Sequence, residues 1–244
     1  MPQTEAAGLG KALLRTASFS CYPQDMFLAV LLLALAMPKP TPAKTAPCAP
    51  PGDATKAEIR ALNEEKSRND TPADDDIDET VTIDGLIEPG DDSLRWQDGL
   101  AVEVVAWVVD VRDGGATSGN CHSTDPGDHD TILEISPDAD VFDPAHRVYA
   151  AVTPARRRLM AKVGEDWSTR SLRAQFLHRY VSVTGWLVFD AEGASKALNT
   201  AEDAGPSIAR ATAWEIHPVT ALELAEEGGA ETAARTSSGP LCGP

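Results

Sequence analysis

The stretch AVEVVAWVVDV, residues 101–111, is a long run of β-branched and other apolar residues in a chain of 244. Apolar side chains occupy both alternating sets of positions, so we expect both faces of this strand to be covered. Such a strand is typical of a sheet that lies between a core and an outer layer. The stretch therefore predicts a long barrel strand with further elements packed outside it.

Four more strands are expected after this one, and the periodicity changes once among them. The predicted strands are 130–136, 147–154, 180–190 and 209–224. Helical segments are predicted at 155–163 and 169–179, the second with Ser168 as its N-cap. The order β-β-β-α-β-β predicts a mainly β fold with one or two helices, an OB-like five-stranded barrel. An open α+β sheet is the alternative.

Two residues in these strands predict local irregularity. Gly185 lies in the middle of the fourth strand, where glycine is typical of a bend or a bulge. Pro218 lies in the fifth strand and has no amide proton to donate to a neighbouring strand. We therefore expect an edge, a bulge or an open seam of the barrel at Pro218.

The N-terminal flank contains an apolar segment. Residues 26–37, MFLAVLLLALAM, are fewer than the roughly 20 of a membrane-spanning helix and typical of a signal-peptide core, and Ala34-Leu35-Ala36 matches a cleavage pattern. We expect a signal peptide or short hydrophobic leader at 1–37, export to a periplasmic or secreted location, and no transmembrane span in the mature form. Anchoring to a membrane by this segment is the alternative.

The other flanks are predicted to be flexible. Residues 38–92 are Pro-rich and then acidic, which predicts an extended linker interrupted by a short helix at 53–66. Residues 226–244 are rich in Gly, Ser and Ala, which predicts a disordered tail. The OB-like domain is therefore expected at 93–225, a length usual for one domain.

The chain is strongly acidic, with 38 Asp and Glu against 21 Lys and Arg and a net charge of -17. This excess disfavours sequence-independent nucleic-acid binding, which depends on neutralising phosphates. Arg156, Arg157, Arg158 and Lys162 form a local basic stretch that suggests contact with nucleic acid or another anion. A solvated helix face is the alternative.

Removal of the leader would leave three cysteines, Cys48, Cys121 and Cys242. A Cys48–Cys242 bridge is compatible with an oxidising compartment, although the spacing specifies no pairing. The sequence has no C-x-x-C pair, which excludes a zinc ribbon and a thioredoxin-like motif.

The segment GNCHSTDPGDHD, residues 119–130, concentrates side chains that bind metals. Cys121, His122, His129 and Asp130 could hold a divalent metal, because thiolate and imidazole suit zinc and carboxylates suit calcium or manganese. The spacing matches no established ligand signature. The alternative is a turn in which Asp side chains bond backbone amides. No other cofactor is predicted.

Glu215 and His217 are two residues apart in the last strand and are expected to project from one face, about 7 Å apart, with Val219 beside them. If the 119–130 loop folds over this face, Asp130 or a loop histidine would complete a His/carboxylate cluster. With His217 as an imidazole ligand or base, such a cluster suits metal binding or general-base catalysis.

The alternative interpretation of this pair is structural. Glu215 would pair with Arg210 or Arg112, and His217 would bond a backbone carbonyl, because buried polar groups generally find partners. Serine-nucleophile motifs, glycine-rich phosphate loops and H-E-x-x-H are absent from the sequence. The catalytic candidates are therefore limited to Asp130, Glu215 and His217.

Three segments, GNCHSTDPGDHDTILEI (119–135), VTGWLVFD (183–190) and RATAWEIHPVT (210–220), resemble small exported bacterial proteins of uncharacterised function that end in a similar WEIHPV strand. The resemblance covers about half of the chain. It implies an OB-like core in an envelope or secreted setting and brings no established activity. Staphylococcal-type nucleases share the general fold, but their catalytic Arg/Asp/Glu pattern is not recognisable here.

Together these patterns favour an exported, non-catalytic binding module over an enzyme. Its expected ligand is an envelope component, an oligosaccharide or a protein. The first alternative is a metal-dependent hydrolase or nuclease that uses the His/carboxylate cluster. The second is nucleic-acid binding through the basic helical stretch, which the overall charge disfavours.

Overall fold

The computed structural model describes residues 48–139, 141, 143–200 and 207–226. The predicted leader at 1–37, the predicted tail beyond its first residue, and Cys242 lie outside these ranges. Within the described residues, no helix combines the length and the apolar character needed to cross a bilayer.

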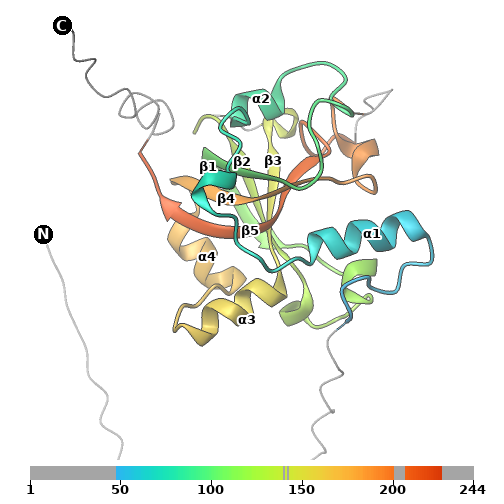
Figure 1. Cartoon of the computed structure of the whole chain (residues 1–244). Helices are drawn as coiled ribbons and strands as arrows, with labels where there is room; N and C mark the ends of the chain where they lie inside the picture. Colours follow the sequence, from blue (N-terminus) through green and yellow to red (C-terminus); the bar gives the residue numbers. More distant parts are fainter. Residues whose placement is uncertain (1–47, 140, 142, 201–206, 227–244) are drawn as a thin grey trace, which may run out of the picture. The chain divides into compact units, whose positions relative to one another are not determined.

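Five strands form a closed barrel in the order β1-β2-β3-β5-β4 (Figure 1). They are β1 (Leu100–Asp113), β2 (Thr131–Ser136), β3 (Val148–Val152), β4 (Tyr180–Phe189) and β5 (Trp214–Leu224). Neighbouring strands are antiparallel except β3 and β5, which are parallel. The barrel confirms the predicted mainly β, OB-like fold, and the alternative of an open α+β sheet is wrong.

The long strand β1 changes partner along its length. Its residues up to Trp107 pair with β4, and its residues from Trp107 onward pair with β2. The even-numbered residues from 102 to 108 are buried, whereas Glu103 is exposed and Trp107 is only partly buried. The expectation that both faces are fully covered is therefore wrong, because the outer face of β1 meets solvent along part of its length.

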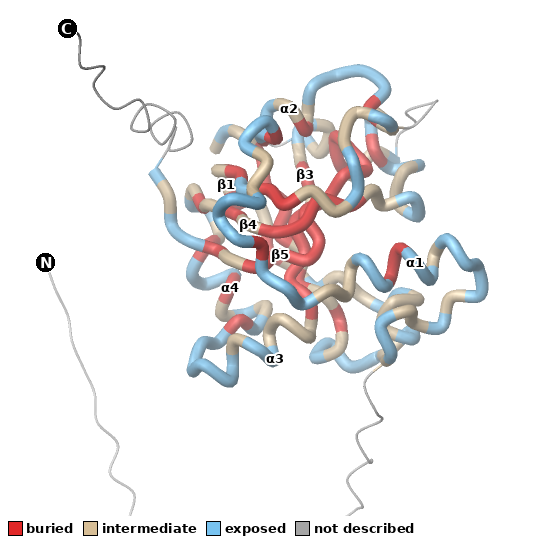
Figure 2. The backbone as a smooth tube through the Cα atoms, in the orientation of Figure 1, coloured by how far each residue is buried: buried red, intermediate tan, exposed pale blue. Residues whose placement is uncertain are grey.

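Two helices, α3 (Pro154–Lys162) and α4 (Thr169–Phe176), connect β3 to β4 and lie below the strands in Figure 1. The Oγ of Ser168 accepts a hydrogen bond from the N–H of Ser171 at 3.2 Å, which confirms Ser168 as the N-cap of α4. Leu172 and Phe176 on α4 are buried in the core, whereas α3 has no buried residue (Figure 2). Short 3-10 turns lie at Asp74–Asp76, Ser118–Asn120, Pro126–Asp128, Pro144–His146 and Ala194–Lys196.

Residues 48–92 pack against the barrel, so the prediction of a flexible linker is wrong for this part of the chain. They contain α1 (Ala57–Lys66), close to the helix predicted at 53–66, and α2 (Ile83–Ile87). Val81, Ile83 and Leu86 are buried in the same core as the strands. These three residues directly follow an acidic run, whose composition hid their burial. The folded domain therefore begins well before residue 93.

A disulfide joins Cys48 to Cys121, whose Cα atoms are 5.7 Å apart. This pairing corrects the Cys48–Cys242 bridge considered from the sequence. The cysteines meet because the chain before α1 runs against the loop after β1. Gly52 makes this contact with a left-handed φ of +65°, and a Cβ at this position would lie 2.0 Å from the carbonyl oxygen of Ser118. A close backbone approach of this kind leaves no signal in cysteine spacing.

Strands β4 and β5 lose regular register where Gly185 meets Pro218. The register shifts on both sides of Gly185, and a Cβ there would lie 2.5 Å from the carbonyl oxygen of Pro218. The irregularity predicted at each of these residues is confirmed. It also changes which side of β5 faces the core, since Ile216 is buried in the core before it and Val219 after it.

Candidate functional site

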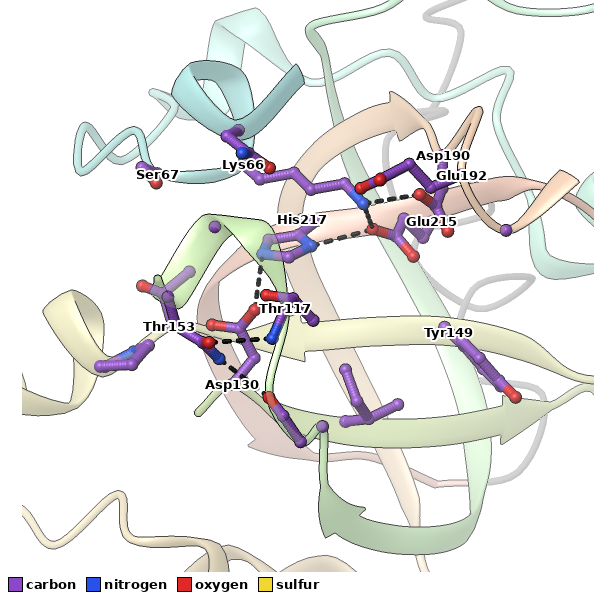
Figure 3. Close-up of a pocket in the computed structure, with 18 of the residues that line it drawn as sticks. Lys66, Ser67, Thr117, Asp130, Tyr149, Thr153, Asp190, Glu192, Glu215 and His217 are labelled. Carbon is purple, nitrogen blue, oxygen red and sulfur yellow. Dashed lines mark hydrogen bonds and ion pairs between the residues drawn. The ribbon is translucent and has the colours of Figure 1, made fainter. Parts of the chain in front are cut away.

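A pocket of about 640 Å³ opens beside α1 on the side of the barrel (Figure 3). Its wall comes from α1, the end of β1 and the loop after it, strands β2, β3 and β5, the start of α3, and the turn after β4. Most of the side chains that line it are polar or charged. The volume lies within the range of roughly 300–1,000 Å³ that is usual for small-molecule sites.

Strand β5 presents Glu215 and His217 to the floor of this pocket. Ile216 between them points into the core, as the alternation of a strand requires. The expectation that Val219 shares their face is wrong, because the irregular pairing at Pro218 turns Val219 into the core. Glu215 and His217 are 4% and 5% exposed, so both are polar groups buried beneath the pocket.

Glu215 is the centre of a buried ionic network. Its Oε2 accepts a hydrogen bond from Nη1 of Arg210 at 2.9 Å. Its Oε1 lies 2.9 Å from Nζ of Lys66 and 2.9 Å from Nδ1 of His217. Figure 3 shows Lys66 reaching from α1 toward Glu215 and His217 approaching the same carboxylate oxygen. The predicted pairing of Glu215 with Arg210 is confirmed.

Asp190, directly after β4, connects the two cations of this network. One of its carboxylate oxygens lies 2.8 Å from Nζ of Lys66, and the other lies 2.5 Å from Nη2 of Arg210. Gly193 leaves room for the second contact, because a Cβ there would lie 2.1 Å from Arg210 Nη2 and 2.2 Å from Asp190 Oδ2. The network therefore fixes α1, β5 and the turn after β4 relative to one another.

The charges in this network shift one another's pKa values. Burial alone would raise the pKa of Glu215, but Lys66, His217 and Arg210 hold it well below its usual range. Burial likewise works against the charge of Lys66, yet Glu215 and Asp190 raise the pKa of its amine above the ordinary value. Glu215, Lys66 and Arg210 are therefore charged at neutral pH.

His217 faces Asp130, the residue that ends the 119–130 loop, on the side opposite Glu215. His217 Nε2 and Asp130 Oδ2 are 3.6 Å apart, which is an ion-pair distance but too long for a hydrogen bond. Burial raises the pKa of Asp130, while the charges of His217 and Lys66 act against this rise. Among the described residues, none hydrogen-bonds His217 Nε2 or the Asp130 carboxyl group, and both side chains line the pocket.

The tautomer of His217 follows from its contact with Glu215. An ionised carboxylate only accepts hydrogen bonds, so Nδ1 of His217 carries a proton. A neutral imidazole would then have its lone pair on Nε2, toward Asp130. The two groups that face each other across this gap are thus a ring nitrogen and a carboxyl group, and both line the pocket.

The loop ligands predicted from the sequence are brought together only in part. Asp130 reaches His217, as the hypothesis of a folded-over loop required. Cys121 is bonded to Cys48, so the prediction of Cys121 as a metal ligand is wrong. The ring of His122 is exposed and lies 3.6 Å from Asp53, an ion-pair contact away from the network.

His129 is buried within the loop and uses both ring nitrogens. Its Nδ1 lies 2.7 Å from a carboxylate oxygen of Asp113, and its Nε2 lies 2.7 Å from the carbonyl oxygen of Ser123. Both partners are acceptors, so both nitrogens donate. These contacts raise the pKa of His129, and the Ser123 carbonyl makes the largest contribution. This geometry fits the structural turn and contradicts a metal-ligand role for His129.

The residues at the site do not fit the divalent metal considered from the sequence. Across the ranges that the structure describes, no group of three or more His, Cys, Asp or Glu side chains is placed to hold a metal ion. Lys66 and Arg210 already neutralise Glu215 and Asp190. These two cations occupy the electrostatic role that a metal would have.

The basic stretch divides into structural and exposed residues. Arg156 donates to a carbonyl of β5, and Arg157 donates to backbone carbonyls of the 119–130 loop. Arg158 and Lys162 are exposed, and Arg158 also lines the pocket. The stretch therefore does not present a continuous cationic surface.

Sequence reasoning missed Lys66 and Asp190. Lys66 is 149 positions before Glu215 in the numbering, at the end of a helix assigned to a flexible linker. The sequence indicates Asp190 only weakly, because this carboxylate directly follows the mostly apolar strand β4, which pairs with β5. Arg112, named as a second partner for Glu215, instead donates to Glu134 at 2.8 Å.

Comparison with known proteins leaves the site to be interpreted from its geometry. No protein-family model matches this chain, and no curated protein matches it. The resemblance to exported bacterial proteins therefore rests on the three sequence segments named above, and it assigns no role to any residue of the network.

Proposed function

We propose that the protein is an exported, non-catalytic binding module whose ligand site is the pocket beside α1, β3 and β5. The proposal is carried by the pocket floor, where carboxylates and cations neutralise one another at hydrogen-bond distances. Groups held in this way are fixed in position by their partners. A rigid polar floor favours recognition of a polar ligand.

Exposed side chains around the mouth of the pocket support this proposal. Asn69, Thr117, Glu192 and Lys196 line the pocket and are exposed. They offer hydrogen-bond donors and acceptors and one charge of each sign. A polar envelope component, such as an oligosaccharide or a peptide, has complementary groups.

Export is supported by two features. The Cys48–Cys121 disulfide suits an oxidising compartment, since disulfides are rare in reducing cytosol. The apolar segment at 26–37 has the length of a signal-peptide core. In an exported setting, a ligand from the cell envelope would be within reach.

The alternative functions have less support. A metal-dependent hydrolase requires a metal-binding cluster, and none is placed among the described residues. Nucleic-acid binding through the arginines requires free cations, whereas Arg156 and Arg157 are engaged by the protein's own carbonyl groups. We therefore do not favour either function.

The proposal is tested by screening the purified protein against soluble envelope oligosaccharides and short peptides, with thermal shift and NMR titration. We expect at least one of these ligands to bind saturably. Thr117→Trp places a bulky ring at the exposed pocket mouth and is expected to weaken binding about tenfold or more through steric exclusion. Leu94→Trp is the control, because Leu94 is 94% exposed and does not line the pocket.

Three outcomes would contradict the proposal. Binding that is equal in Thr117→Trp and Leu94→Trp would place the ligand elsewhere. Conversion of a bound oligosaccharide or peptide to products would show an enzyme. Failure of every oligosaccharide and peptide to bind would remove this ligand class.

A further inference from the structure

We propose that Asp130 and His217 together form a recognition point for a neutral hydroxyl group, so that the pocket takes a carbohydrate. This inference rests on the proposed binding function and names its ligand class. It starts from the 3.6 Å separation of His217 Nε2 and Asp130 Oδ2 at the pocket. Among the described residues, neither atom has a hydrogen-bond partner, and the side chain of His217 is only 6% exposed.

The two groups contrast with the rest of the network. Glu215 is bonded by Arg210, Lys66 and His217, and its contacts are all 2.9 Å. The Asp130 carboxyl group receives no such contact, and its side chain is 27% exposed at the pocket. The pocket floor is therefore satisfied except at the point where Asp130 and His217 face each other.

The chemistry of the missing partner follows from donor and acceptor roles. With one proton on the pair, either the Asp130 carboxyl group donates and His217 Nε2 accepts, or His217 Nε2 donates and the Asp130 carboxylate accepts. A group that bridges them must both accept and donate a hydrogen bond. A hydroxyl group does both, whereas a carboxylate accepts only and an ammonium group donates only.

The distance fits such a bridge. A hydroxyl oxygen about 2.8 Å from each atom forms a triangle with a pair separated by 3.6 Å. Water has the same donor and acceptor capacity, and bridging waters of this kind are usual in binding sites. A ligand with many hydroxyl groups can replace this water without losing its hydrogen bonds, which favours carbohydrate over peptide.

The test uses neutral trisaccharides of glucose and of N-acetylglucosamine as probes, with binding measured by calorimetry on the full disulfide-bonded chain. We expect Asp130→Ala to weaken binding of the best trisaccharide about tenfold, because it removes one charge-assisted hydrogen bond and leaves His217 without a partner. Asp130→Asn keeps both a donor and an acceptor and should bind within about threefold of the unaltered protein. Asp75→Ala, which removes an exposed carboxylate outside the pocket, is the control.

A second readout separates recognition from a structural role. The ring-nitrogen NMR signals of His217 should shift when trisaccharide is added to the unaltered protein. They should not shift with the permethylated trisaccharide, which keeps acceptors and loses hydroxyl donors. Thermal melts without ligand report whether each variant is folded.

The outcomes distinguish this inference from the proposed function. Suppose that a trisaccharide binds and that Thr117→Trp blocks it, but that Asp130→Ala binds it as tightly as Asp75→Ala does. Recognition of a hydroxyl group by Asp130 and His217 is then wrong, and the proposed binding module stands. If peptides bind at the pocket and no trisaccharide does, the carbohydrate inference is likewise overturned. If neither class binds, both proposals fail. A crystal structure in which Asp130 hydrogen-bonds His217 directly, with no bridging water or ligand, would also overturn it.

Discussion

Arg210 illustrates how closely the site depends on individual residues. Its side chain is 2% exposed and contacts Asp190 and Glu215 through separate nitrogens. Its guanidinium also lies over the ring of Tyr149, 4.9 Å from the ring centre. Such a buried cation is tolerated because its partners are fixed, and Gly193 is one of the residues that makes the arrangement fit.

Gly193→Ala should disrupt this arrangement. The added Cβ would occupy the space of Arg210 Nη2 and Asp190 Oδ2, and neither buried group can move without losing an ion pair. We expect the free energy of unfolding to fall by about 2–4 kcal/mol, measured by urea denaturation. Ser195→Ala, at an exposed neighbour, should change it by less than about 0.5 kcal/mol.

A double-mutant cycle gives this prediction a stricter check. In an Arg210→Ala background, Gly193→Ala should cost much less, because the clash with the guanidinium is removed. An equal cost in both backgrounds would mean that Gly193→Ala does not act through Arg210.

At the scale of elements, α1 is attached to the barrel by a few specific contacts. It buries Leu62 and Asn63, and most of the helix surface is exposed (Figure 2). Lys66 at its end provides the ion pairs with Glu215 and Asp190, and the Cys48–Cys121 disulfide holds the chain before it. A helix with so little apolar burial depends on these contacts for its position.

Removal of the disulfide should therefore loosen α1 before it affects the barrel. In Cys48→Ser/Cys121→Ser, we expect faster amide hydrogen exchange in α1 with nearly unchanged protection in β1 and β4. The loss of stability should be about 2–4 kcal/mol, as expected for a bridge that spans 73 positions. Reduction of the unaltered protein should reproduce the pattern, and equal loss of protection in the strands would contradict it.

The sequence predicts elements better than it predicts their contacts. The five strands and the α3–α4 region follow from local periodicity, and Gly185 and Pro218 signal the irregular pairing of β4 and β5. The side of β5 that Val219 occupies could not be predicted. An irregularity interrupts the alternation of inward and outward side chains, and the pairing with β4 decides where the alternation resumes. Lys66 could not be assigned to the site for a similar reason, since α1 is positioned by distant contacts.

At the scale of the whole molecule, pH acts on stability in two opposite directions. The depressed pKa of Glu215 contributes stability above its ordinary value of 4.5, and this contribution is lost as pH falls through the folded-state value. The raised pKa of His129 contributes stability below its ordinary value of 6.5, and this contribution is lost as pH rises through the folded-state value. The raised pKa of Asp130 also makes the protein less stable as the pH rises, and this loss of stability begins above the ordinary value of 3.8.

The net charge of -17 adds to the loss of stability at higher pH, because repulsion among carboxylates grows as the pH rises above the isoelectric point near 4.6. We therefore expect the free energy of unfolding to be greatest at weakly acidic pH, about 5 to 6, and to fall toward both pH 3 and pH 8. Urea denaturation at constant ionic strength across this range measures the profile. His129→Asn should flatten the alkaline side and leave the acid side unchanged, because the acid side depends on Glu215. A stability that rises continuously up to pH 8 would show that neither His129 nor Asp130 keeps its raised pKa in the folded protein.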